Sequence, residues 1–168
     1  AFSIIYVFRE DIFKLIGGLI RLESEQVSFA SKIILSSIPV GIIGILFEDQ
    51  VEKLFTGNIL LVGSMLILTS LLLFLSNYSK SDPKGKITYK KALIIGVAQA
   101  FAIMPGISRS GTTIATALLL NIDKKESTRF SFLMVLVPIF GILILKVIEG
   151  FQSPEIFINK DLTTAYTV

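Results

Sequence analysis

The residues best suited to chemistry form one short run inside the apolar stretch 92–120: Pro105-Gly-Ile-Ser-Arg-Ser-Gly-Thr-Thr113. This run places a guanidinium, four hydroxyls and two helix-breaking residues where a membrane protein normally has only aliphatic side chains. An arginine at membrane depth costs about 2.5–3.5 kcal/mol even on the lenient insertion scale. A negatively charged ligand is the simplest reason to keep it there.

The run predicts a break between two helices. Pro105 lacks an N–H donor and Gly106 permits unusual backbone angles, so together they end the first helix. Ser108 or Ser110 can then cap the start of the second. We expect the N–H groups of residues 111–113 to be left unpaired at that start. A helix start carries roughly half a positive charge and suits phosphate.

Arg109 adds a full charge and a planar donor fork that matches phosphate oxygens. The hydroxyls of Ser108, Ser110 and Thr112 can fill the remaining positions around the anion. Gln99 could face the same cavity, although an interhelical hydrogen bond explains it equally well. The alternative is that Arg109 extends to the interface and the hydroxyls pack between helices. The candidate catalytic residues are Arg109, Ser108 and Ser110, and the candidate substrate-binding residues are Pro105, Gly106, Gly111, Thr112, Thr113 and Gln99.

Composition excludes several classes of protein. Of the 168 residues, 52% are hydrophobic and 17% are charged, against about 25% charged in a soluble domain. The absence of cysteine and histidine excludes a thiolate site, a Ser-His-Asp triad and a zinc-histidine site within this chain. The net charge of +3 is small, and nothing in it indicates a nucleic-acid partner.

The apolar segments predict an all-α polytopic membrane protein, a transmembrane helix bundle with spans near 33–47, 58–76 and 130–148. An amphipathic interfacial helix is expected over 12–22. The stretch 92–120 is too long for one span and too short for two. We therefore predict two half-helices, 89–103 and 110–120, forming a re-entrant unit over 89–121. Broken backbone at membrane depth survives where protein or a water-filled cavity surrounds it.

Loop charges agree with this topology. The loop 77–91 has five lysines against one acid, and the loop 121–129 has three basic residues among nine. The acidic loops 48–57 and 149–161 have one lysine each. The positive-inside rule places the first two loops in the cytoplasm and the other two outside. This pattern holds only if 92–120 begins and ends on the same face.

Polar residues elsewhere are interpreted as structural. Ser64, Thr69 and Ser70 are expected to pack between helices. Glu126 and Arg129, three apart near a helix start, are expected to form a solvated pair. Both chain ends lie in apolar runs, and the first residue is not methionine. We therefore expect an internal fragment of a longer protein, with residues 1–168 forming a single membrane domain.

The run from Gly96 to Ile114 resembles the second signature of the undecaprenyl-diphosphate phosphatase family, the bacitracin-resistance proteins. The family pattern is Pro-Gly-x-Ser-Arg-Ser-Gly-x-Thr, and this chain matches all seven specified positions, with Thr113 as the last. The segment 129–133 and Pro138 also resemble the family's next helix.

The resemblance implies a multi-pass enzyme of the bacterial inner membrane. Such an enzyme hydrolyses undecaprenyl diphosphate to undecaprenyl phosphate and inorganic phosphate, and so recycles the lipid carrier for peptidoglycan synthesis. The implied fold is an inverted repeat of re-entrant helix pairs. The implied cofactor is a divalent cation, magnesium or calcium, with most of its ligands outside this chain. The partners are the lipid substrate and the membrane, and a homodimer is compatible with the sequence.

The sequence departs from the family in one respect. The family's first signature, Glu-Gly-x-x-Glu followed by Pro-x-Ser-Ser-x-Gly-His, is absent from these residues. By repeat symmetry, Gln99 stands where that signature has its first glutamate. We expect this chain by itself to be inactive. The alternative function is a transporter or lipid flippase that binds an anionic headgroup at half-helix ends. A structural membrane subunit would leave the cost of Arg109 unexplained.

Overall fold

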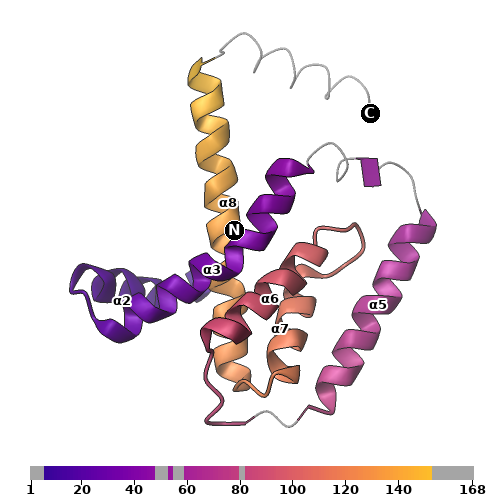
Figure 1. Cartoon of the computed structure of the whole chain (residues 1–168), viewed down its shortest axis with the longest axis horizontal. Coiled ribbons are helices and arrows are strands. Elements are labelled where there is room, and N and C mark those ends of the chain that lie inside the picture. The colour runs from indigo at the N-terminus through magenta and orange to yellow at the C-terminus, as the bar shows by residue number, and fades with distance from the viewer. Residues whose placement is uncertain (1–5, 48–52, 55–58, 80–81, 153–168) are drawn as a thin grey trace. The chain divides into compact units, whose positions relative to one another are not determined.

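The computed structural model describes residues 6–47, 53–54, 59–79 and 82–152, and these ranges contain helices and loops without any strand. The order of helices along the chain is shown in Figure 1. Their bounds are α2 Arg9–Ile20, α3 Ser24–Leu46, α5 Ile59–Asn77, α6 Tyr89–Phe101, α7 Arg109–Leu119 and α8 Lys124–Gln152.

Three of these helices are long and apolar enough to cross a membrane: α3, α5 and the portion of α8 up to Ile144. At 1.5 Å per residue the 19 residues of α5 extend about 28 Å, close to the roughly 30 Å of a bilayer's hydrocarbon core. The helices and the three candidate spans of the described residues confirm the expected all-α membrane fold. The inverted repeat stays a prediction.

Some predicted bounds were wrong. The span expected at 33–47 begins at Ser24, and the span expected at 130–148 begins at Lys124. A span predicted from hydropathy ends at the first charged residues, whereas the hydrogen bonds of the helix continue through those residues. Asp123 shows how this happens, because its Oδ2 accepts from the N–H groups of Lys125 at 2.9 Å and Glu126 at 3.2 Å. A capped start of this kind allows a helix to begin in a polar segment.

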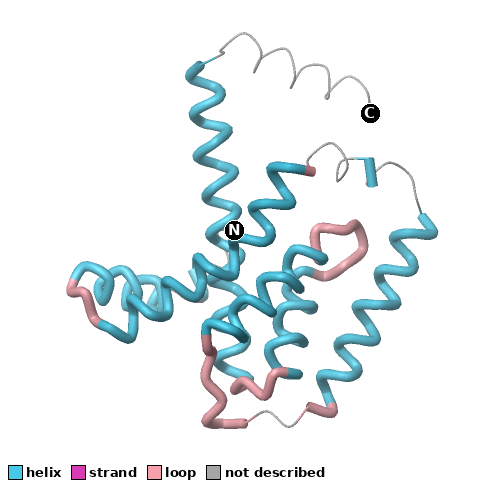
Figure 2. Tube along the Cα trace, in the orientation of Figure 1, coloured by secondary structure: helices cyan, strands magenta, loops and turns pink. Residues whose placement is uncertain are grey.

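The stretch 92–120 is broken, as predicted. α6 ends at Phe101, two residues before the expected bound, and α7 begins at Arg109. The two helices pack against each other, and the connection between them is a loop (Figure 2). α3 packs on α6, and α5 packs on α7. The α6–α7 pair is therefore held by a helix on either side.

The outer ends of the α6–α7 pair are joined. The N–H of Asp123 donates to the carbonyl of Gly85 at 3.1 Å, and the Ser79 hydroxyl donates to the carbonyl of Leu118. Asn121, with φ of 54°, ends α7 in the left-handed conformation typical of a helix C-terminus. The loop before α6 and the loop after α7 thus contact each other. Their position in a bilayer stays a prediction.

The core of this part of the chain lies where α3, α6 and α8 meet. Phe29, Ile95 and Phe130 are buried there, and the rings of Phe29 and Phe130 meet edge to face at 5.8 Å. Gly96 allows the helices to approach closely, because an added Cβ would lie 2.3 Å from the carbonyl oxygen of Ser36. Most large side chains of α5 are exposed, as expected of a helix facing lipid.

The chain divides into two compact units, residues 1–137 and 138–168. The first unit contains every group discussed below. In the second, the described residues 138–152 belong to α8, which has Pro138 in its interior. The expectation of a single domain stays a prediction.

The joined loops generate a test of topology. Because the chain has no native cysteine, single cysteines introduced at Lys84 and Lys125 give labelling signals without background from these residues. Both should react with a membrane-impermeant maleimide from the same side of the membrane. A cysteine at Lys53, beyond the other end of α5, should react only from the opposite side. Labelling of Lys84→Cys and Lys125→Cys from different sides would contradict a re-entrant 89–121 unit.

Candidate functional site

The loop between α6 and α7 makes a tight turn at its centre. Pro105 is buried, and Gly106 has a φ of +92°, which L side chains rarely adopt. An added Cβ at Gly106 would lie 2.6 Å from the carbonyl oxygen of Val62 on α5. The turn therefore needs glycine for two reasons, its backbone angle and its contact with α5.

Ser108 is the residue that caps α7. Its side-chain oxygen accepts from the N–H of Gly111 at 3.2 Å, and its carbonyl accepts from the N–H of Thr112 at 2.8 Å. The prediction that the amides of residues 111–113 are bare was therefore wrong at 111 and 112. Within the described residues, the first-turn amides without an acceptor are those of Arg109 and Ser110. Because Ser108 caps the helix, the unpaired amides begin at Arg109, two residues before the predicted start at 111.

The chemistry of the turn suits an anion. Arg109 is half-buried and forms no ion pair with any acid in the described ranges. Its guanidinium, the two bare amides and the positive end of α7 all favour negative charge. Ser108 is exposed and Ser110 is half-buried, so both hydroxyls lie at the accessible start of the helix.

The two threonines of the run differ in their surroundings. The Thr113 hydroxyl donates to the carbonyls of Arg109 at 3.0 Å and Ser110 at 3.2 Å, so its proton is engaged within α7. The Thr112 hydroxyl is buried and has no partner within the described part of the chain. Thr113 thus stabilises the first turn of α7, and Thr112 retains hydrogen-bonding capacity.

Gln99 is the most unusual polar residue near the break. It lies on α6, two residues before the last, and its side chain is completely buried. Neither Oε1 nor Nε2 has a hydrogen-bond partner among the described residues, so the interhelical bond considered from sequence is not formed there. A buried polar group without a partner costs about 1–3 kcal/mol, so the Gln99 amide retains unused hydrogen-bonding capacity beside the break.

The turn does not fit the divalent cation that the family resemblance implies. Its donors are a guanidinium, amide N–H groups and hydroxyls, whereas magnesium and calcium take carboxylate and carbonyl oxygens. No group of three or more acids that could hold a metal occurs in the ranges described. The divalent cation stays a prediction.

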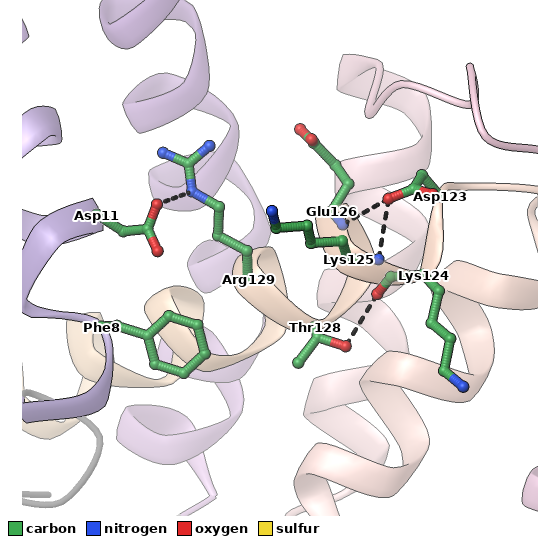
Figure 3. Close-up of a pocket in the computed structure, with 8 residues that line it drawn as sticks. All are labelled: Phe8, Asp11, Asp123, Lys124, Lys125, Glu126, Thr128 and Arg129. Atoms are coloured by element: carbon green, nitrogen blue, oxygen red, sulfur yellow. Dashed lines mark hydrogen bonds and ion pairs between the residues drawn. The ribbon is translucent and has the colours of Figure 1, made fainter.

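A second polar cluster lies between the start of α2 and the start of α8 (Figure 3). Arg129 Nε lies 2.8 Å from Asp11 Oδ1, and the guanidinium also lies 4.7 Å from the centre of the Phe29 ring. The N–H is not aligned for a hydrogen bond, so the contact is an ion pair. The predicted Arg129–Glu126 pair was wrong, because the packing of α2 brings Asp11 closer. This cluster borders a cavity of about 740 Å³.

Sequence reasoning missed Thr69. Its hydroxyl oxygen accepts from the N–H of Ser108 at 3.3 Å and so ties α5 to the turn. A hydroxyl in an apolar segment can be recognised from the sequence, but Ser64 and Ser70 are hydroxyl residues of the same helix. Only the packing of α5 on α7 separates Thr69 from these two residues.

Comparison with known proteins decides the family. The family described as "Bacitracin resistance protein BacA" matches residues 1–167. The chain belongs to this family. The Ser108–Arg109–Ser110 turn, with its cap and helix break, lies within the matched residues.

Curated relatives agree with the family. A protein of Christiangramia forsetii named undecaprenyl-diphosphatase is 50% identical over 161 residues, which are 95% of this chain and 59% of the relative. Proteins with the same name from Bacteroides fragilis and Methanococcus maripaludis are 44% and 37% identical. The match to the Bacteroides fragilis protein covers 89% of this chain and 58% of that protein. The match to the Methanococcus maripaludis protein covers 92% of this chain and 63% of that protein. The chain therefore spans less than two thirds of the length of these relatives.

Proposed function

We propose that the protein is an integral membrane phosphatase that hydrolyses undecaprenyl diphosphate to undecaprenyl phosphate and inorganic phosphate. This activity would recycle the lipid carrier of cell-wall synthesis in the bacterial inner membrane, with the chain crossing it several times. One observation carries the proposal. A broken helix in a BacA-family chain places Arg109 and two amides without an acceptor at the start of one helix.

The reaction needs what the turn offers. When a diphosphate is hydrolysed, the P–O–P bond breaks and negative charge moves onto the oxygens of the transferred group and of the leaving phosphate. Catalysis of this step is mostly positioning and charge stabilisation by fixed donors. We assign Arg109 to the transferring phosphoryl group, and the amides of Arg109 and Ser110 to its oxygens. The hydroxyls of Ser108, Ser110 and Thr112 complete the set of donors.

The nucleophile and the general base are assigned elsewhere in the protein. The chain has no histidine, and the residues of the turn are cationic or neutral. The family's acidic first signature, which this sequence lacks, is the proposed source of both groups and of the ligands for a divalent cation. Pairing with a second copy of the chain stays a prediction.

Gln99 is proposed to hydrogen-bond the diphosphate group or a group that holds it. The Gln99→Met change should raise the melting temperature of the ligand-free protein, because methionine fills similar space without a buried amide. It should also lower phosphate release, because the amide is lost from the site. Gln26→Met is the matched control, since Gln26 Oε1 is likewise buried without a described partner, but on α3 beside Gly18. Full activity in Gln99→Met would show that Gln99 does not belong to the site.

The role of Arg109 is tested by the Arg109→Ala change in the intact protein. Removing one preorganised donor of this kind lowers kcat by about 10²–10³-fold, and Arg109→Lys should recover only part, because lysine lacks the planar fork. The measurement is release of inorganic phosphate from a polyprenyl diphosphate in detergent. Arg21→Ala, at an exposed arginine after α2, is the matched control and should leave kcat unchanged.

Two outcomes would contradict the proposal. Near-normal turnover in Arg109→Ala would show that the turn is not the catalytic site. Binding of the lipid by the unaltered protein without any release of phosphate in detergent would favour a transporter or flippase, because hydrolysis needs no membrane gradient.

A further inference from the structure

We propose that Thr69 on α5 is a positioning residue for the phosphate-binding turn. Its hydroxyl holds the backbone of Ser108, so that Ser108 caps α7 and the amides of Arg109 and Ser110 stay free for the anion. This inference rests on the proposed function of the turn. It adds a residue that lies 39 positions earlier in the chain and outside the signature run.

The contact is specific in its hydrogen bonding. The Thr69 hydroxyl donates its proton to the carbonyl of Met65 at 3.0 Å and accepts from the N–H of Ser108 at 3.3 Å. The first bond orients the hydroxyl so that a lone pair remains for the second. Thr69 is buried in a helix whose residues are mostly apolar. No other acceptor for the Ser108 N–H occurs among the described residues.

Packing brings the turn to this hydroxyl. An added Cβ at Gly106 would lie 3.1 Å from Val62 Cα and 3.2 Å from Met65 Cβ, and one at Gly111 would lie 3.6 Å from Thr69 Cγ2. Val62, Met65 and Thr69 are spaced at i, i+3 and i+7, so they lie along one face of α5. The turn therefore contacts α5 over two helical turns, and the hydrogen bond to Thr69 is a polar contact within this stretch.

The hydrogen bonds of Ser108 explain how the effect reaches Arg109. Ser108 uses its N–H on Thr69, its carbonyl on Thr112 and its side chain on Gly111. All three bonds fix the residue that directly precedes Arg109. Without the Thr69 hydroxyl the N–H of Ser108 loses its acceptor in this partly buried contact, and we expect the turn to shift toward another partner. Such a shift moves the first turn of α7, where the donors for the anion lie.

Ser70 provides a control within the same helix. Its hydroxyl makes the same kind of bond, to the carbonyl of Leu66 at 2.9 Å, but the side chain is exposed and forms no hydrogen bond with the turn within the described residues. A general effect of removing a hydroxyl from α5 would appear equally at Ser70. An effect on the turn would appear only at Thr69.

The test compares Thr69→Val, Thr69→Ser and Ser70→Ala in the intact protein, with kcat and KM for phosphate release measured alongside the melting temperature. Thr69→Val keeps the shape and removes the hydroxyl, so we expect kcat to fall at least about tenfold, the rate equivalent of about 1.4 kcal/mol, with little change in KM. Thr69→Ser should stay within about threefold of the unaltered protein, and Ser70→Ala should match it. If Thr69→Val does not fold, Thr69→Ala against Thr69→Ser measures the same loss of a hydroxyl.

The outcomes separate the two proposals. A normal kcat in Thr69→Val, or an equal loss in Thr69→Ser, would overturn the role of Thr69. A lower melting temperature with unchanged kcat would show a structural role only and would also overturn it. Arg109→Ala, measured in parallel, reports on the site itself. If Arg109→Ala is inactive while Thr69→Val is normal, the site stands and the positioning role fails.

Discussion

A helix that breaks inside an apolar stretch releases backbone groups that must find new partners, and this requirement governs the structure around the turn. An unpaired backbone group in a bilayer core costs several kcal/mol. The N–H of Ser108 is paired with Thr69, and those of Gly111 and Thr112 are paired with Ser108. From Ser108 to Thr112, the amides of Arg109 and Ser110 are left without an acceptor among the described residues. Closing the turn in this way thus leaves two donors at the start of α7.

The neighbouring helices follow from this need. α3 supports α6 through a close approach that depends on Gly96, and α5 supports the turn through the face that contains Val62 and Thr69. At the other end of the pair, the loops are joined by the bond between Asp123 and Gly85. The α6–α7 pair is therefore fixed at both ends. A fixed pair suits electrostatic catalysis, in which donors must be in place before charge develops.

Much of this could be predicted from sequence, for identifiable reasons. The break at 92–120 follows from Pro105 and Gly106 and from a length that fits neither one span nor two. The cap followed from the preference of serine for that position, although the choice between Ser108 and Ser110 needed the structure. The bare amides were misplaced, because a capping side chain satisfies the third amide of a helix, not the first. Hydropathy likewise missed where α3 and α8 begin.

Other features could not be predicted, because they depend on contacts between distant segments. The role of Thr69 requires knowing which face of α5 packs on the turn, and the Asp11–Arg129 ion pair requires knowing where α2 lies. The isolation of the Gln99 amide is also a result of packing. In each case the residue type was visible in the sequence, and the partner was not.

Whether the start of α7 binds phosphate can be measured by amide NMR of the intact protein in detergent, titrated with a methylenediphosphonate analogue of a short prenyl diphosphate. We expect the amide resonances of Arg109 and Ser110 to shift strongly and saturate together, because these donors are free to bind phosphate oxygens. The amides of Gly111 and Thr112, already engaged by Ser108, should move much less. Saturable binding of the analogue without a shift of the Arg109 and Ser110 resonances would show that these amides do not bind the phosphates.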